Sequence, residues 1–156
     1  MAAYYPKFMI WLDKNKEHCC PAHVTLGNEG MYYIRTKNRK WSYSLPRAAI
    51  DRAGDFKKVR RVWLGADDAY IIETKDSWIW DLAGNYGSLG DTLEEYDESD
   101  GVKEIAMNIE DPRCYVIISE TSEYAWNAGS KGNTFSDADL KKYITMNFRG
   151  TSEDED

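Results

Sequence analysis

Residues 62–82 constrain the fold of this chain more than any other stretch, because their pattern recurs before and after them. They contain a Val-Trp-Leu-Gly segment, an apolar Ala-Tyr-Ile-Ile segment and a Trp-Ile-Trp segment, separated by short polar runs. Short apolar or alternating segments between turn-forming residues are typical of antiparallel strands joined by tight turns. We therefore predict two or three short strands in this stretch.

The same pattern occurs upstream and, more weakly, downstream of this stretch. The matching segments are residues 24–27, 31–37 and 41–45 upstream, and residues 105–109, 114–118 and 124–127 downstream. When the copies are aligned, both Trp positions of the central copy hold an aromatic residue in every copy. The aligned residues are Trp78 with Trp41 and Tyr124, and Trp80 with Tyr43 and Trp126. Positions of this kind are expected first of all to pack neighbouring units together.

A short helix is predicted after the third strand of each copy. Residues 47–53 lie between a proline, which suits the first turn of a helix, and a glycine, which suits its end. After the central copy, Leu89, Leu93 and Tyr96 fall on one face of a second helix. Residues 136–144 are expected to form the third helix.

These elements predict a mainly β protein with short helices, in which three β-β-β-α units recur roughly 40 residues apart. The units span approximately residues 20–55, 58–99 and 102–146. They belong to a single repeat domain, residues 1–150, and an acidic tail follows at residues 151–156. One unit cannot bury its own apolar face, whereas stacked neighbours can. Propeller-like packing and open, twisted antiparallel sheets are both compatible with the pattern.

A further strand is predicted ahead of the units, at residues 4–12. Phe8, Ile10 and Leu12 alternate with Met9 and Trp11, so that both faces of this strand are apolar. A strand that is apolar on both faces is typically buried.

The glycine turn, the Tyr-apolar-apolar strand and the Trp-x-Trp strand resemble the blade repeats of β-propeller proteins, including intracellular proteins of mainly fungal origin. The resemblance covers about residues 24–144 and implies blades arranged around an axis. Propellers usually have four or more blades. The leading strand would then complete the last unit, or two or more copies of the chain would complete a ring; an open array fits equally well.

The composition disfavours nucleic acid and membranes as partners. The chain carries 20 basic and 27 acidic residues, a net charge of −7, which suits the phosphate backbone poorly. One basic run, residues 57–61, is interpreted as a solvated strand face or a charged sheet edge. No apolar run reaches membrane-spanning length, and no signal peptide is recognisable. The 3 cysteines, two of them adjacent, do not suggest a disulfide framework, so we expect a reducing, cytoplasmic setting.

Four side chains that can bind a metal occur close together: His18, Cys19, Cys20 and His23. Zinc needs about four such ligands that converge on one point. Adjacent cysteines point apart in an extended chain, and no second pair lies elsewhere. We interpret the segment as a loop with free thiols, keep a metal site as the alternative, and predict no cofactor.

No catalytic residue is assigned, and we do not expect an enzyme. The chain lacks a phosphate-binding loop, a dinucleotide-binding glycine motif and a serine-nucleophile motif, and its 2 histidines both lie in the segment just described. The function predicted is a non-catalytic binding or assembly module that contacts a protein partner or its own copies. The resemblance also implies an alternative, an intracellular lectin whose aromatic side chains stack on a glycan.

Six residues are the candidate binding residues. Trp63 and Asp81 differ between copies, since the first copy has Thr25 and Ser44 there. Positions that vary between units are better candidates for function than positions that pack every unit. The remaining candidates are the aromatic residues that a lectin of this kind would use: Trp41, Trp78, Trp80 and Trp126.

Overall fold

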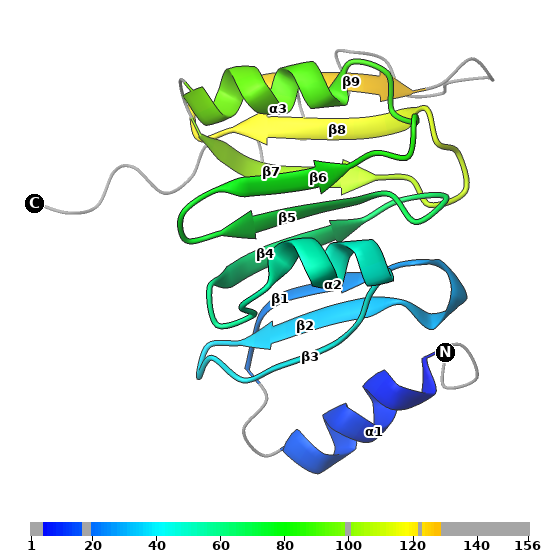
Figure 1. The fold of residues 1–156 in the computed structure, drawn as a ribbon, viewed down its shortest axis with the longest axis vertical. Coiled ribbons are helices and arrows are strands. Elements are labelled where there is room, and N and C mark those ends of the chain that lie inside the picture. Colours follow the sequence, from blue (N-terminus) through cyan, green and yellow to red (C-terminus); the bar gives the residue numbers. More distant parts are fainter. Residues whose placement is uncertain (1–4, 17–19, 99–100, 122, 129–156) are drawn as a thin grey trace, which may run out of the picture.

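The computed structural model describes residues 5–16, 20–98, 101–121 and 123–128. In this part of the chain, nine strands form three separate antiparallel sheets, accompanied by three short α-helices (Figure 1). Each sheet is open and has its second strand in the middle. The predicted mainly β class and the tandem three-stranded units are therefore confirmed. The helix predicted at residues 136–144 and the acidic tail lie outside the described residues.

The sheets follow one another along the chain. The first contains β1 (Pro21–Leu26), β2 (Tyr32–Thr36) and β3 (Trp41–Ser44); the second contains β4 (Val59–Leu64), β5 (Tyr70–Thr74) and β6 (Trp78–Asp81); the third contains β7 (Val102–Met107), β8 (Cys114–Ser119) and β9 (Tyr124–Ala128). The helices are α1 (Pro6–Asn15), α2 (Arg47–Ala53) and α3 (Leu89–Glu98), and a 3-10 turn spans Asn28–Gly30. α2 has the bounds that the sequence predicted.

The leading segment is a helix, so the strand predicted at residues 4–12 is wrong. α1 begins at Pro6, where a proline suits the first turn. Its Phe8, Trp11 and Leu12 pack against the first sheet, and their spacing of three and four residues places them on one helix face. A short apolar run does not by itself distinguish a helix from a strand, and here the contact with the sheet selects the helix. No leading strand therefore completes the last unit.

Strand register confirms the alignment of the three copies. In each sheet a tyrosine of the middle strand lies opposite the last residue of the first strand. Counted from that tyrosine, the aromatic residues of the third strands fall at equivalent positions. The equivalent sets are Trp41, Trp78 and Tyr124, and Tyr43, Trp80 and Trp126. The register of every first strand also shifts at the same place, as it does at a β-bulge.

Each sheet has a helix-bearing face, which carries the tyrosine just mentioned and an isoleucine two residues later. The pairs are Tyr32–Ile34, Tyr70–Ile72 and Tyr115–Ile117. The helix that packs with each pair is the one that precedes the sheet in sequence: α1 for the first, α2 for the second and α3 for the third. In packing terms a unit is therefore a helix followed by three strands, and α1 belongs to the first unit.

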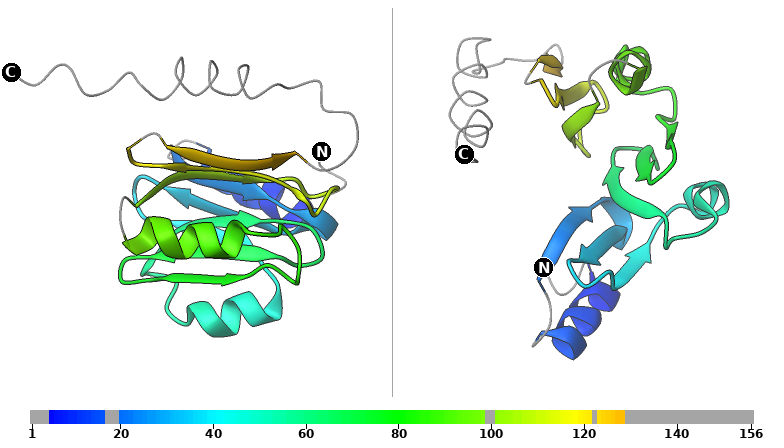
Figure 2. Two further views of the ribbon diagram at one scale, coloured as in Figure 1. Left: turned by 90° about the horizontal axis from the view of Figure 1, so that it is seen from above. Right: turned by 90° about the vertical axis from the view of Figure 1, so that its left-hand side faces the viewer.

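The sheets stack face to face. The side of a sheet away from its own helix, here called the opposite face, carries Tyr33 in the first sheet and Ile71 in the second. Tyr33 is 0% exposed in the core between the first and second sheets, and Ile71 is 0% exposed in the core between the second and third. Each interface thus joins the opposite face of one sheet to the helix-bearing face of the next (Figure 2).

A buried hydroxyl ends the middle strand of every sheet. Thr36, Thr74 and Ser119 are exposed by 1%, 9% and 0%. Each bonds to backbone groups of the turn that follows; Thr36, for example, accepts from the Lys40 amide at 3.1 Å and donates to the Lys40 carbonyl at 3.2 Å. Because buried turn amides need partners, these hydroxyls fix the second turn of each unit.

Candidate functional site

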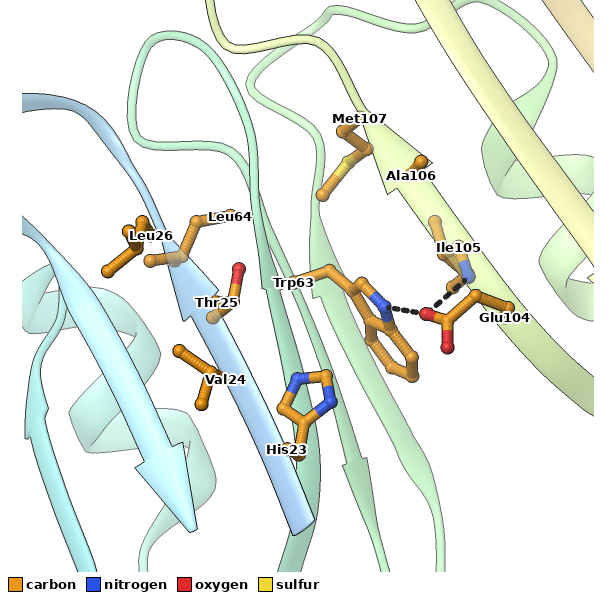
Figure 3. A pocket seen from close by; sticks show the side chains of 10 residues that line it. All are labelled: His23, Val24, Thr25, Leu26, Trp63, Leu64, Glu104, Ile105, Ala106 and Met107. Carbon is orange, nitrogen blue, oxygen red and sulfur yellow. Dashed lines mark hydrogen bonds between the residues drawn. The ribbon is translucent and has the colours of Figure 1, made fainter. Parts of the chain in front are cut away.

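The first strands of the three sheets, β1, β4 and β7, meet at a pocket of about 260 Å³ (Figure 3). β1 contacts β4 and β4 contacts β7, although each pair belongs to different sheets. Three side chains with polar groups line the pocket, namely His23, Thr25 and Glu104, together with the indole of Trp63. The pocket therefore exists only because the three sheets are stacked.

Trp63 connects the second sheet to the third. Its indole Nε1 donates a hydrogen bond of 2.8 Å to Glu104 Oε1, and its ring stacks on Trp78 with centroids 5.7 Å apart. The guanidinium of Arg61 lies 4.9 Å from the centroid of the same ring. Trp63 is only 5% exposed, so its faces are occupied by protein groups and it offers no open ring for a ligand.

His23 connects the first sheet to the second. Its Nε2 lies 2.6 Å from the carbonyl oxygen of Val62, and its ring lies edge-on to Trp63, 5.4 Å between centroids. Two acceptors would repel at 2.6 Å, so Nε2 carries the proton and donates it to the carbonyl. Burial lowers the pKa of His23, against the opposing effect of the Val62 bond. The ring is therefore neutral near pH 7, and its Nδ1 is an acceptor.

His23, Arg61 and Glu104 occupy one equivalent position, directly after the irregularity in each first strand. His23 reaches the backbone of β4, and Arg61 reaches the backbone of β7, where it donates to the carbonyls of Val102, at 2.7 Å, and Lys103. Arg61 also pairs with Glu73. Its side chain is 24% exposed, so this member of the basic run does not lie on a solvated face. Side chains at this one position therefore link the first sheet to the second and the second sheet to the third.

Glu104 differs from its two counterparts because it points back toward the second sheet. Its Oε1 accepts from Trp63 and, at 3.1 Å, from the backbone amide of Ile105. Within the described residues, Oε2 and the hydroxyl of Thr25 have no hydrogen-bond partner, and neither is a buried unsatisfied atom. The pocket therefore presents one carboxylate oxygen and one hydroxyl to solvent (Figure 3).

Of the six residues predicted as binding residues, only Trp63 lines this pocket. Trp78 and Trp80 are half-buried against the core between the second and third sheets, and Trp41 is half-buried against the core between the first and second. Trp126 is also half-buried and lies opposite Val116 in the third sheet. Asp81 is exposed at the end of β6 and accepts from the Ala83 amide at 3.0 Å. The aromatic candidates therefore do not form one open surface.

The predicted metal ligands are only partly described. His18 and Cys19 lie outside the described residues, Cys20 is an exposed free thiol, and His23 is engaged with Val62. Among the residues that the structure covers, no three His, Cys, Asp or Glu side chains are grouped so that they could hold a metal ion.

The structure also shows the surroundings of the Cys114 thiol. Cys114 is a free, half-buried thiol. Desolvation and the neighbouring Asp111 carboxylate raise the pKa of this thiol. Hydrogen bonds from Arg113 lower the pKa of the Asp111 carboxyl to about 2. A thiol with a raised pKa is protonated at neutral pH, whereas nucleophilic attack needs the thiolate.

Sequence reasoning missed Glu104 and Thr25 as pocket residues. The repeat alignment pairs Thr25 with Trp63 and places His23, Arg61 and Glu104 directly before the aligned first strands, but it does not indicate which of these side chains face a pocket. The strand register confirms that these three dissimilar residues share a position.

No helix among the described residues is long and apolar enough to cross a membrane. Comparison of the chain with models of known protein families, with curated proteins and with solved structures found no match.

Proposed function

We propose that this chain is a non-catalytic binding module that takes a basic side chain of a partner protein into the pocket between β1, β4 and β7. The observation that carries the proposal is the free Oε2 of Glu104 in a pocket that three sheets build together and that the hydroxyl of Thr25 also lines. A carboxylate oxygen and a hydroxyl are acceptors that suit an ammonium or guanidinium group.

The size of the pocket favours a side chain over a whole ligand. Pockets for small molecules usually enclose roughly 300–1,000 Å³, and this one encloses about 260 Å³. A single side chain presented by a protein segment fits this volume, and apolar neighbours such as Leu26, Leu64 and Met107 suit its aliphatic stem.

The charge of the pocket favours a basic partner group. His23 is neutral, Arg61 is paired with Glu73, and Glu104 is thus the one lining residue that carries a formal charge. The whole chain has a net charge of −7, which attracts basic partners during diffusion.

A binding role rather than catalysis follows from what the titratable groups already do. The two titratable side chains that line the pocket are each held by a contact between sheets, His23 Nε2 by the Val62 carbonyl and Glu104 Oε1 by the Trp63 indole. The free thiols of Cys20 and Cys114 suit the reducing cytoplasm that we propose as its location.

The test uses peptides with one Lys or Arg flanked by neutral residues, and matched peptides with Gln or Glu in its place. Binding is measured by fluorescence anisotropy to the intact chain and to Glu104→Gln. The substituted amide still accepts from Trp63, so the fold is retained while the charge is removed. We expect the dissociation constant of the basic peptides to rise at least about tenfold, the loss of one charge-assisted hydrogen bond.

Glu94→Gln is the matched control, because it removes the same charge at an exposed position on α3. The proposal is wrong if the unaltered chain and Glu104→Gln bind the basic peptides with equal affinity. It is also wrong if the unaltered chain binds the Glu-containing peptides as tightly as the basic ones. A glycan array probed with the intact chain tests the lectin alternative, which the half-buried aromatic residues support less well.

A further inference from the structure

Two first strands border the pocket with their backbone edges as well as with their side chains. Residues 23–26 of β1 and residues 104–107 of β7 line it without a gap, and Figure 3 shows the two strands on either side of Trp63. Successive side chains of a strand point to opposite faces, so consecutive residues border one pocket where the edge of the strand faces it. On these edges neither strand has a neighbour in its own sheet, since β1 pairs only with β2 and β7 only with β8.

The register of β1 shows which of its backbone groups point away from β2. The amide of Gly27 donates to the Met31 carbonyl at 2.9 Å, and hydrogen-bonded residues alternate along an antiparallel pair. Thr25 is therefore bonded to β2, whereas the amide and carbonyl groups of Val24 and Leu26 point to the free edge. These edge groups have no hydrogen-bond partner among the residues that the structure describes.

At the register position of Val24, the other two first strands have side chains on their edge groups. On β4, Nε2 of His23 lies 2.6 Å from the carbonyl oxygen of Val62 and 3.2 Å from its amide nitrogen. On β7, the amide of Ile105 donates to Glu104 at 3.1 Å. Val24 is 42% exposed, whereas Val62 and Ile105 are 0% and 3% exposed, so β1 is the most accessible of the three strands at this position.

A free strand edge beside a pocket is the arrangement by which sheets bind extended peptides. The unpaired edge is a template for another strand, and main-chain bonds give affinity while pockets for alternate side chains give selectivity. β1 has unpaired groups at its edge, and Glu104 lies in the pocket beside it. A residue opposite Thr25 on an added strand points to the side of the sheet on which His23 meets Trp63, which is the side of the pocket.

We propose that the basic side chain of the partner is presented by an extended segment that adds to the free edge of β1 as a fourth strand of the first sheet. The inference rests on the proposed function, because Glu104 supplies the charge that selects a basic residue. The backbone of the segment bonds to the edge groups of Val24 and Leu26. Its basic residue lies opposite Thr25 and enters the pocket, which then has to hold only one side chain, in agreement with its volume of about 260 Å³.

The test uses the basic peptides of the pocket experiment, with a single backbone N-methyl group moved along the peptide one residue at a time. A methyl group on an amide that faces β1 removes a donor and blocks the approach of the two strands, whereas the next amide along faces away. We expect the dissociation constant to rise at least about tenfold at every second residue and to change less than about twofold at the residues between. The unaltered chain is used throughout, so its fold is the same in every measurement.

Val24→Pro tests the same contact from the side of the chain. Proline removes the edge-facing amide of Val24, which is not bonded to β2, and proline is accepted on edge strands where the missing amide would face solvent. Val24→Ala is the matched control, because it shortens the side chain but keeps the amide. We expect Val24→Pro to bind the unmethylated peptide about threefold to tenfold more weakly than Val24→Ala, the loss of one backbone hydrogen bond. Circular dichroism checks that both variants are folded, and the methylated peptides decide the question if Val24→Pro is not.

Three results overturn the added strand. They are N-methyl groups without effect, N-methyl groups that weaken binding equally at adjacent residues, and equal affinity of folded Val24→Pro and Val24→Ala. If Glu104→Gln still weakens binding of the basic peptides, the pocket proposal stands and only the strand addition is wrong. If the effect of methylation has a period of two but Glu104→Gln binds as tightly as the unaltered chain, the strand addition is supported and the selection of a basic side chain by the pocket is wrong.

Discussion

Arg61 offers the sharpest test of how the stack of sheets is held together. It reaches from β4 to two carbonyl groups of β7, lies over the ring of Trp63 and pairs with Glu73. The substitution Arg61→Met keeps much of the aliphatic stem but removes the charge and every donor. We expect the second and third sheets to be weakened against each other, and Glu73 to lose its closest partner.

The magnitude follows from the burial of Glu73. Removing one partner of a buried ion pair costs about 3–5 kcal/mol, because the other charge is left without compensation. The side chain of Glu73 is 12% exposed, but Arg60 lies 3.7 Å away and compensates part of the charge. We therefore expect Arg61→Met to lower the free energy of unfolding by about 3 kcal/mol, a large fraction of the roughly 5–15 kcal/mol typical of a domain.

The assay is urea unfolding followed by tryptophan fluorescence, combined with a double-mutant cycle. Glu73→Met is expected to be destabilising on its own, and the double variant should lose about 1–2 kcal/mol less than the sum of the single losses, since neither charge is then left alone. Amide hydrogen exchange should rise more in the third sheet than in the first, because the bonds that Arg61 makes outside its own sheet go to the third.

Arg47→Met is the matched control, since Arg47 pairs with Asp51 on α2 with side chains 85% and 58% exposed. Such a pair on a helix surface is worth only about 0.3–0.5 kcal/mol. A loss below about 1 kcal/mol for Arg61→Met, or strictly additive effects in the cycle, would refute the view that this residue links the sheets.

Two further predictions concern stability. Burial lowers the pKa of His23 in the folded state, so the unfolded chain takes up a proton first as the pH falls. The stability that the neutral ring contributes is complete above the pKa of the unfolded state. It is lost as the pH falls through the pKa of the folded state. The urea midpoints measured at about pH 7 and about pH 5 should therefore differ less in His23→Gln than in the unaltered chain. An equal difference in both proteins would contradict the lowered pKa of His23. Thr36→Val leaves the Lys40 amide without its side-chain acceptor in a site that is 1% exposed, and should cost about 1–3 kcal/mol by calorimetry, whereas an effect near zero would mean that water replaces the hydroxyl.

Much of the local structure could be predicted from the sequence. The alternation of Trp78 and Trp80 predicts strand β6 and places both on one face, and the structure packs both against the core between the second and third sheets. The proline and glycine around residues 47–53 predict α2. These features follow from local periodicity and turn chemistry, which neighbouring residues encode by themselves.

The candidate site could be predicted only in part. Trp63 stood out because it differs from Thr25, and it does line the pocket. Glu104 did not stand out, because it becomes a pocket residue only when the first strands of the three sheets come together. A side chain that acts across an interface has no signal in its own segment.

The repeat, the nine strands, two of the helices and the faces of the aromatic residues in the third strands follow from the sequence alone. Tertiary structure decided that residues 6–15 are a helix, that each helix serves the sheet after it, and that Val24 is uncovered while Val62 is not. The physical reason is that the alternation of side chains specifies which residues share a face. What that face meets depends on the long-range packing of whole sheets, to which every unit contributes and which no single segment encodes.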